Sequence, residues 1–186
     1  MSSFSRRGFM ASAGGAALMT AGCANGIGSK GGAAIDARVQ TTLNYLFNRY
    51  PGTQELSNKA SGMLVMPLVT EAGFGIGGAY GRGALRVGDA TVDYYLQAEA
   101  SIGFQIGAQQ YAHVLFFMTD EALQNFRTSP GWVAGADIKY AIQNEGDRLS
   151  ADTITSLTPV VAVVFGQAGL IAGATIEGTK YTRIIP

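Results

Sequence analysis

The chain has 186 residues, with 13 basic and 13 acidic side chains, a formal net charge of zero and one cysteine. The balanced charge argues against a strongly basic nucleic-acid-binding face, and a single cysteine excludes an internal disulfide. Apolar residues make up 47% of the chain and glycine contributes 26 positions, so we expect a folded, glycine-punctuated domain and no disordered polymer.

The first 22 residues have the three parts of an export signal. Ser5–Phe9 is a twin-arginine segment, Ala11–Ala21 is a weakly apolar run, and small residues precede Cys23. Cys23 occupies the position that bacterial lipoproteins acylate. We therefore predict a signal peptide over 1–22 and palmitate-like chains on Cys23 that anchor the protein to a membrane. The alternatives are general secretory export and an ordinary signal that leaves Cys23 a free thiol.

Removal of this signal would leave 164 residues, enough for one domain with a substantial core. The remaining 11 basic and 13 acidic side chains give a net charge of −2. Residues 23–33 are rich in glycine and are predicted to be a lipidated tether, although a tether without function would have the same composition. The folded domain is expected over 34–186.

Two helices are predicted at the start of this domain. From Ala34 to Tyr50 apolar residues recur every three or four positions, as on one face of a helix that packs on a core. Pro51 and Gly52 end this helix, and a second short helix is expected over 54–60. A third helix should begin after Thr119, a good N-cap residue, and run to Phe126.

Strand patterns fill most of the remaining chain. Glycines at 73, 75 and 77 alternate with Phe74 and Ile76, which leaves one strand face bare. Such a face requires the close approach of another backbone, a ring or a ligand. The predicted strands cover 63–66, 73–83, 91–105, 111–118, 133–142, 159–164, 169–177 and 181–185. We expect an α+β fold weighted to β, in which a glycine-rich antiparallel sheet curls toward a barrel or sandwich, with the helices packed on it.

The run from Val160 to Ile176 is the most apolar of the chain. It is short for a transmembrane helix, contains many β-branched residues and is divided by Gly166 and Gly169. A strand, a turn over 166–169 and a second strand explain it better than a membrane helix, which is the alternative.

An ordered set of segments resembles the SYLF domain over about residues 35–185. The segments are Gly81–Val87, Thr91–Tyr95, Ser101–Gln109, Phe117–Leu123 with Phe126 and Arg127, Gly131–Asp137, and Gly169–Gly178. Together with the export signal they resemble the bacterial branch of the family. The resemblance implies a lipid-binding module and no enzyme. Eukaryotic members are associated with phosphoinositide membranes and in some cases with actin, ligands that an exported bacterial protein would hardly meet. Many members have a tryptophan where this chain has Tyr94 and Tyr95, which puts in doubt any ligand contact credited to that ring.

No active site can be assembled from the sequence. His113 is the only histidine and lies in a strand pattern, which is typical of a structural residue. One histidine and an acylated cysteine do not make a zinc site, and no Gly-x-Ser-x-Gly motif is present. The run Gly73–Gly83 lacks the Gly-Lys-Ser/Thr ending of a phosphate loop. We therefore expect no catalytic residue, no metal site and no cofactor.

The candidate lipid-binding residues are cations next to glycine. Arg82 and Arg86 are four apart in one predicted strand, so they share a face and are suited to grip a phosphate. Lys139, Lys180 and Arg183 would join them only if the sheet brings them close. The alternative is that all five are solvated surface charges.

The leading hypothesis is therefore a membrane-anchored lipoprotein whose domain binds membrane phospholipid in the cell envelope. Ala24 after the cysteine resembles the signal for transfer to the outer membrane in cells that have two, which predicts the periplasmic face of that membrane. The alternative is a scaffolding lipoprotein that binds a protein partner. A hydrolase would have to depend on His113.

Overall fold

The computed structural model describes residues 29–135, 138–140, 158–166, 169–170 and 176–186. The predicted signal peptide and Cys23 lie outside these residues. Three helices and seven strands follow one another along the described chain. They are α2 (Gly31–Arg49), α3 (Gly52–Lys59), β1 (Gly62–Val87), β2 (Ala90–Phe117), α4 (Asp120–Thr128), β3 (Trp132–Val133), β4 (Lys139–Tyr140), β5 (Val160–Gly166), β6 (Gly169–Leu170) and β7 (Lys180–Ile184).

The helices form close to where the sequence predicts them. Helix α2 begins at Gly31, three residues earlier than expected, and buries the predicted apolar stripe. Its buried residues are Ile35, Val39, Leu43 and Leu46. Helix α4 follows Thr119, whose hydroxyl accepts a hydrogen bond from the Ala122 amide at 3.1 Å. The predicted N-cap is therefore confirmed.

Strands β1 and β2 form one long antiparallel hairpin. Their register runs without a crossover from Gly62 opposite Phe117 to Val87 opposite Ala90. The two-residue turn uses Gly88, whose φ of +57° is accessible to glycine at little cost. The prediction of separate strands over 63–66, 73–83, 91–105 and 111–118 was wrong, because β1 continues past Pro67 through a bulge between Met66 and Val69.

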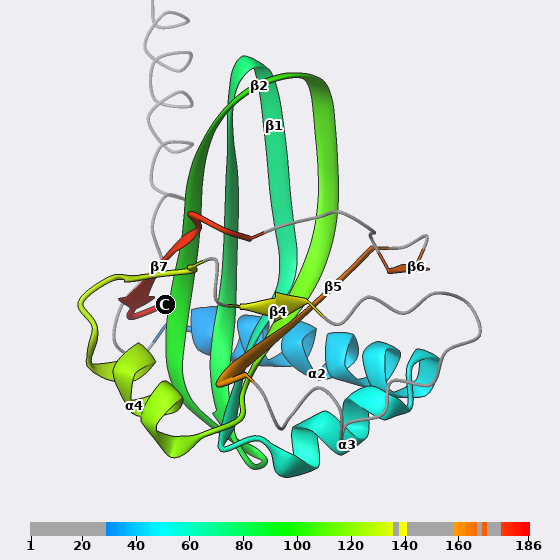
Figure 1. The fold of residues 1–186 in the computed structure, drawn as a ribbon, viewed down its shortest axis with the longest axis vertical. Coiled ribbons are helices and arrows are strands. Elements are labelled where there is room, and N and C mark those ends of the chain that lie inside the picture. The colour runs from blue at the N-terminus through cyan, green and yellow to red at the C-terminus, as the bar shows by residue number, and fades with distance from the viewer. Residues whose placement is uncertain (1–28, 136–137, 141–157, 167–168, 171–175) are drawn as a thin grey trace, which may run out of the picture.

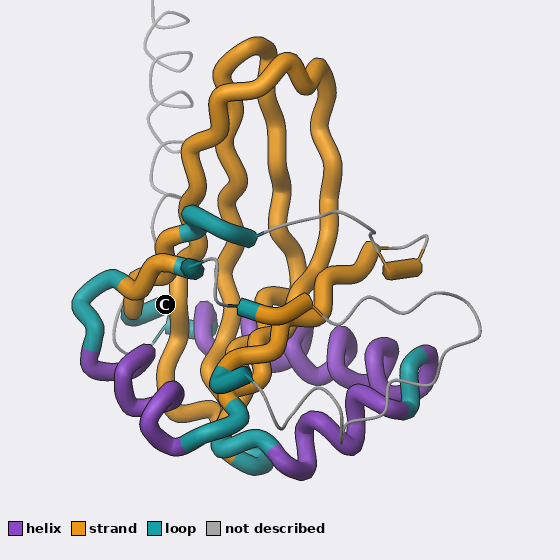
Figure 2. The backbone as a smooth tube through the Cα atoms, viewed as in Figure 1, coloured by secondary structure: helices purple, strands orange, loops and turns teal. Residues whose placement is uncertain are grey.

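This hairpin folds back on itself at the middle of both strands. The register shifts between Phe74 and Gly75, at the far end of the ribbon from the helices (Figures 1 and 2). The second half of β1 then returns beside the first half. A Cβ at Gly81 would lie 2.9 Å from the Leu68 carbonyl oxygen, and one at Gly83 would overlap the Val65 carbonyl. Two of the glycines in this run thus permit the close approach of one backbone to another.

The shorter strands extend the sheet from β2. Strand β5 pairs with the end of β2, and β7 pairs with its beginning. The order in the described sheet is β3-β7-β2-β5-β4, with β1 on β2 and β6 on β5. All pairs are antiparallel except β4 with β5. Strands β5 and β6 are antiparallel, with Gly166 opposite Gly169, which agrees with the predicted reversal between two strands. Residues 167–168 and 171–175 of that prediction lie outside the described residues. Within the described residues, no helix has the length and apolarity needed to cross a bilayer.

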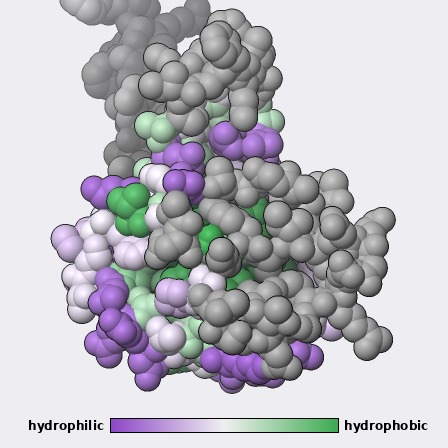
Figure 3. All heavy atoms as spheres, viewed as in Figure 1, coloured by the Kyte–Doolittle hydropathy of each residue, from purple (hydrophilic) through white to green (hydrophobic). Residues whose placement is uncertain are grey.

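Apolar side chains cover both faces of the curled sheet. Alternate residues of β2 and β5, such as Val114 and Val163, pack under α2 and α3. Their neighbours, such as Leu115 and Val164, face the interior together with Phe126 of α4. In Figure 3 the lower rim of this view, over α3 and α4, is hydrophilic, whereas hydrophobic atoms show nearer the middle. The predicted α+β, β-weighted fold with a curled antiparallel sheet is confirmed.

Candidate functional site

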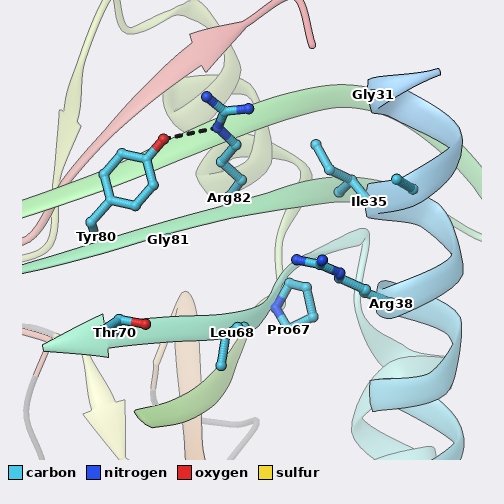
Figure 4. A pocket seen from close by; sticks show the side chains of 10 residues that line it. Gly31, Ile35, Arg38, Pro67, Leu68, Thr70, Tyr80, Gly81 and Arg82 are labelled. Atoms are coloured by element: carbon cyan, nitrogen blue, oxygen red, sulfur yellow. Dashed lines mark hydrogen bonds between the residues drawn. The ribbon is translucent and has the colours of Figure 1, made fainter. Parts of the chain in front are cut away.

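A pocket of about 370 Å³ lies between the first turns of α2 and the folded strand β1. Figure 4 shows that it opens between α2 on one side and the two halves of β1 on the other. Its lining residues are Gly31, Ala34, Ile35, Arg38, Pro67, Leu68, Thr70, Tyr80, Gly81 and Arg82.

Local backbone features of β1 shape this pocket. The bulge at Pro67 adds residues to one strand of the ladder and leaves Leu68 with 40% of its surface exposed. Gly81 lets the returning half of β1 come within contact of Leu68. At the other wall, Gly31 packs against Pro186, and the Ser29 hydroxyl donates to the Pro186 carbonyl at 2.7 Å. The start of α2 is thus held next to the end of the chain.

The charged groups of the pocket are both cations. Arg38 extends from α2, and Arg82 donates from Nε to the Tyr80 hydroxyl at 2.9 Å (Figure 4). Among the described residues that line the pocket, none has an acidic side chain. The closest acid along α2, Asp36, accepts hydrogen bonds from the hydroxyls of Thr91 at 2.9 Å and Tyr94 at 2.8 Å. The pocket therefore favours an anionic ligand.

Tyr94, one of the two tyrosines where the resemblance leads us to expect a tryptophan, lies next to α2. Burial raises the pKa of its hydroxyl, and the hydrogen bond to Asp36 and the charge of that carboxylate raise it further. The hydroxyl therefore stays a donor to Asp36, and this contact ties β2 to α2 beside Gly32. Tyr94 supports the wall of the pocket and is not among its lining residues.

The predicted cations do not gather in one place. Arg82 lines the pocket, but Arg86 donates to Gln40 at 3.4 Å and to the Asp89 carbonyl at 2.5 Å, so its role is to join the hairpin turn to α2. Lys180 lies on the same sheet face as Tyr80, in one row through Ala98. The other two predicted residues are Arg183 and Lys139.

Arg183 lies on the opposite face of the sheet, three residues after Lys180 in β7. It pairs with Asp93 at 3.4 Å, and Arg127 holds the same carboxylate at 3.1 Å. The side chain of Lys139 lies outside the described part of the structure.

Sequence reasoning missed Arg38. It lies away from the apolar stripe of α2, a position typical of a solvated side chain. In the described residues it makes no side-chain hydrogen bond or ion pair, and it reaches the pocket only because α2 crosses β1 there. No signal in the sequence joins a helix position to two strand segments 30 and 44 residues further along.

His113 belongs to a different, buried polar cluster in the sheet interior. Its side chain is fully buried, and Nε2 lies 2.8 Å from the hydroxyl of Tyr181. Burial lowers the pKa of His113 to about 3, so the ring is neutral at physiological pH. Gln97 is also fully buried and donates to the Tyr111 hydroxyl at 3.5 Å. This cluster joins β7 and both halves of β2, which is a structural role.

Metal coordination finds no support in the part of the chain that is described. There, no three side chains of His, Cys, Asp or Glu come together to hold an ion.

The comparisons with known proteins agree with the SYLF resemblance. Residues 98–183 match the Ysc84 family, which is described as Las17-binding protein actin regulator. No curated protein matches the chain. The matched segment begins in β2 and ends in β7, so it includes β3, β4, β5, β6 and α4, while Arg38 and Arg82 precede it. The match over residues 98–183 supports a SYLF-domain (Ysc84) protein.

Proposed function

We propose that this protein is a membrane-anchored lipoprotein of the cell envelope whose SYLF domain binds anionic phospholipid. The pocket between α2 and β1 would hold the phosphate of the headgroup. The observation that carries this proposal is the presence of Arg38 and Arg82 in a pocket whose described lining residues include no acidic side chain. Guanidinium groups bind phosphate oxygens through paired hydrogen bonds and remain charged at all physiological pH values.

The family supports the class of ligand. SYLF domains are associated with lipid binding, and the matching family is described by its binding to Las17 and its action on actin. An exported bacterial protein would meet phospholipid but not actin. Lipid is therefore the ligand that fits both the family and the pocket.

The predicted anchor places the domain where this ligand is abundant. Acyl chains on Cys23 would hold the protein at a membrane, on the periplasmic face of the outer membrane if the cell has two. The domain would then bind lipid of the bilayer that carries it, or lipid passing close to it.

Loss of both pocket arginines should weaken binding to anionic vesicles. We expect Arg38→Gln with Arg82→Gln to lower the affinity for phosphatidylcholine vesicles that contain phosphatidylglycerol by at least about tenfold, because each cation near such a surface contributes about 1 kcal/mol. The protein to use is the chain from residue 23 with Cys23→Ser, so that acyl chains add nothing to the binding. Sedimentation with the vesicles measures it.

A matched pair of substitutions separates the pocket from net charge. Arg49→Gln with Arg127→Gln removes the same charge from exposed positions on α2 and α4, and we expect it to leave binding within about twofold, since exposed charges more than a Debye length from the lipid are screened. If both pairs weaken binding equally, the pocket has no special role. If the parent chain sediments with no envelope phospholipid, the proposed function is wrong.

The anchor has its own test. In living cells labelled with radioactive palmitate, the parent chain should take up label and fractionate with membranes, and the Cys23→Ser variant should do neither. Equal fractionation of the two forms, with no label in either, would remove the lipoprotein part of the proposal. The vesicle experiment does not depend on this result.

A scaffolding lipoprotein is the second candidate, because the family description names the binding of a protein. Cross-linking in detergent-solubilised envelope distinguishes the two. A scaffold would retain a stoichiometric protein partner and no phospholipid.

A further inference from the structure

Exposed apolar side chains gather around the mouth of the pocket. Leu68 and Tyr80 line it and are 40% and 50% exposed. Ile185, 67% exposed, precedes Pro186, which packs against the pocket residue Gly31. We call these three residues, together with Arg38 and Arg82, the pocket-mouth surface. It combines apolar side chains with two cations that form no ion pair within the described part of the chain.

The same sheet face continues this pattern beyond the pocket. Tyr80, Ala98, Lys180 and Val133 form one row across four strands, and all four are exposed. The acids of the neighbouring strand positions, Asp93 and Glu99, alternate onto the other face. There Asp93 meets two arginines, and Glu99 accepts from the Thr179 hydroxyl at 2.7 Å. The row therefore presents apolar groups and a lysine without an acid between them.

The length of chain before α2 fixes which surface comes near the anchoring membrane. Seven residues separate Cys23 from Gly31, and the eight Cα–Cα steps between the two positions span at most about 29 Å when fully extended. Each half of β1 has about 13 residues and is roughly 43 Å long, which is more than the maximum distance from Cys23 to Gly31. The start of α2, and with it the pocket mouth, must stay close to a bilayer that holds Cys23.

We propose that the pocket-mouth surface is the membrane-contacting face of the domain. Leu68, Tyr80 and Ile185 enter the boundary between headgroups and acyl chains, while Arg38 and Arg82 bind headgroup phosphates. The partner is the lipid surface itself, because cations beside apolar side chains match an anionic, amphipathic interface. This inference rests on the proposed lipid binding and adds the orientation in which it occurs.

Single-cysteine labelling tests the orientation. The Cys23→Ser chain contains no cysteine, so Leu68→Cys, Tyr80→Cys and Ile185→Cys each provide one site for an environment-sensitive fluorophore such as NBD. Asn58→Cys on α3 and Gln124→Cys on α4 are exposed controls away from the pocket. With vesicles of phosphatidylcholine and phosphatidylglycerol, we expect the fluorescence at positions 68, 80 and 185 to shift to the blue and to be quenched by nitroxide-labelled lipids. We expect neither change at the two control positions.

A second set of variants measures how much the apolar side chains of the pocket-mouth surface contribute to the affinity for vesicles. Leu68→Ser with Tyr80→Ser should weaken vesicle binding about tenfold, whereas Val87→Ser with Val92→Ser, which are 37% and 39% exposed near the hairpin turn, should not change it.

The outcomes separate this inference from the function on which it rests. Suppose that the chain sediments with vesicles but the labels at positions 68, 80 and 185 are not quenched, or are quenched no more than the controls. The proposed orientation is then wrong, and lipid binding stands. If the chain binds no vesicle, both fail. If the fluorescence of the labels on the pocket-mouth surface shifts without vesicles as the protein concentration rises, this surface is an interface between two copies and the proposed orientation is overturned.

Discussion

Gly83→Ala is expected to prevent stable folding of this chain. A Cβ at position 83 would overlap the Val65 carbonyl oxygen and lie 2.5 Å from the Met66 sulfur. The methionine side chain can move, but Val65 is fully buried and held in register opposite Val114. The two halves of β1 would have to separate, which exposes core residues on both faces of the sheet. We expect a loss of more than about 4 kcal/mol, which is a large fraction of the 5–15 kcal/mol typical of a domain.

Urea unfolding followed by circular dichroism measures this loss. The control is Gly88→Asn in the hairpin turn, where φ is +57° and nothing lies within 4 Å of the added Cβ. Asparagine tolerates this left-handed region, so the control should lose at most about 1 kcal/mol. A Gly83→Ala chain that unfolds cooperatively at the urea concentration of the parent would show that the ribbon does not fold back with this contact.

The elements that could be predicted from sequence are those whose signal is local. The stripe of α2 repeats every three or four residues, and Thr119 lies three positions before the amide that it caps. The glycines at 166 and 169, which lie opposite each other in the sheet, are an equally local signal. Each of these patterns depends only on residues that are close together in the sequence, so it can be recognised without the structure.

The fold-back of the ribbon could be predicted only in part. The glycine-rich run indicated that something approaches one strand face closely, but not that the partner is the first half of the same strand. Gly83 and Val65 are brought together by a bend near Phe74, and that pairing is set by burial of both halves against a common core. The prediction of separate strands failed for a related reason, since a bulge at Pro67 lets pairing continue past a residue that lacks an amide proton.

The pocket residues, too, could be predicted from the sequence only in part. The two-residue period correctly placed Arg82 and Arg86 on one strand face, the face that α2 covers. It did not predict that Arg86 would donate a hydrogen bond to Gln40, 46 residues earlier in the chain. Nor did it predict Arg38, because the meeting of a helix with two strand segments is a tertiary event. Candidate residues that depend on such meetings require the structure.

Stability is expected to fall as the pH drops below about 6.5, and His113 is the cause. In the folded chain burial lowers the pKa of His113 to about 3, against an ordinary value of 6.5. Between these values the unfolded chain binds a proton that the folded chain does not, so acid favours unfolding. The slope is about 1.4 kcal/mol per pH unit. This amounts to roughly 2 kcal/mol between pH 6.5 and about pH 5, and to roughly 4–5 kcal/mol by pH 3.

The surroundings of His113 explain why the folded chain resists protonation. Its neighbours in the ladder are Met66 and Val164, and the rings of Tyr111 and Tyr181 flank it. The Tyr181 hydroxyl at Nε2 can accept a hydrogen bond as well as donate one, but Nδ1 has no hydrogen-bond partner among the described residues. A charged ring would therefore carry an N–H that is buried without an acceptor.

Urea unfolding at several values between pH 8 and pH 5 tests this prediction. His113 is the only histidine, and carboxylates titrate mostly below this range, so the slope between pH 6.5 and pH 5 can be assigned to one group. His113→Gln keeps an amide that can hydrogen-bond to the Tyr181 hydroxyl but cannot titrate. We expect this variant to be less stable at neutral pH and to lose the slope.

Nuclear magnetic resonance of the folded chain gives an independent reading, since the ring protons of His113 should show no titration down to about pH 4. A ring that titrates near 6.5 in the folded chain, together with a parent and a His113→Gln variant that lose stability in parallel, would contradict the buried, neutral state. The interior of the curled sheet would then admit water at His113, and the contact with Tyr181 would not join β7 to β2 as tightly as the 2.8 Å distance implies.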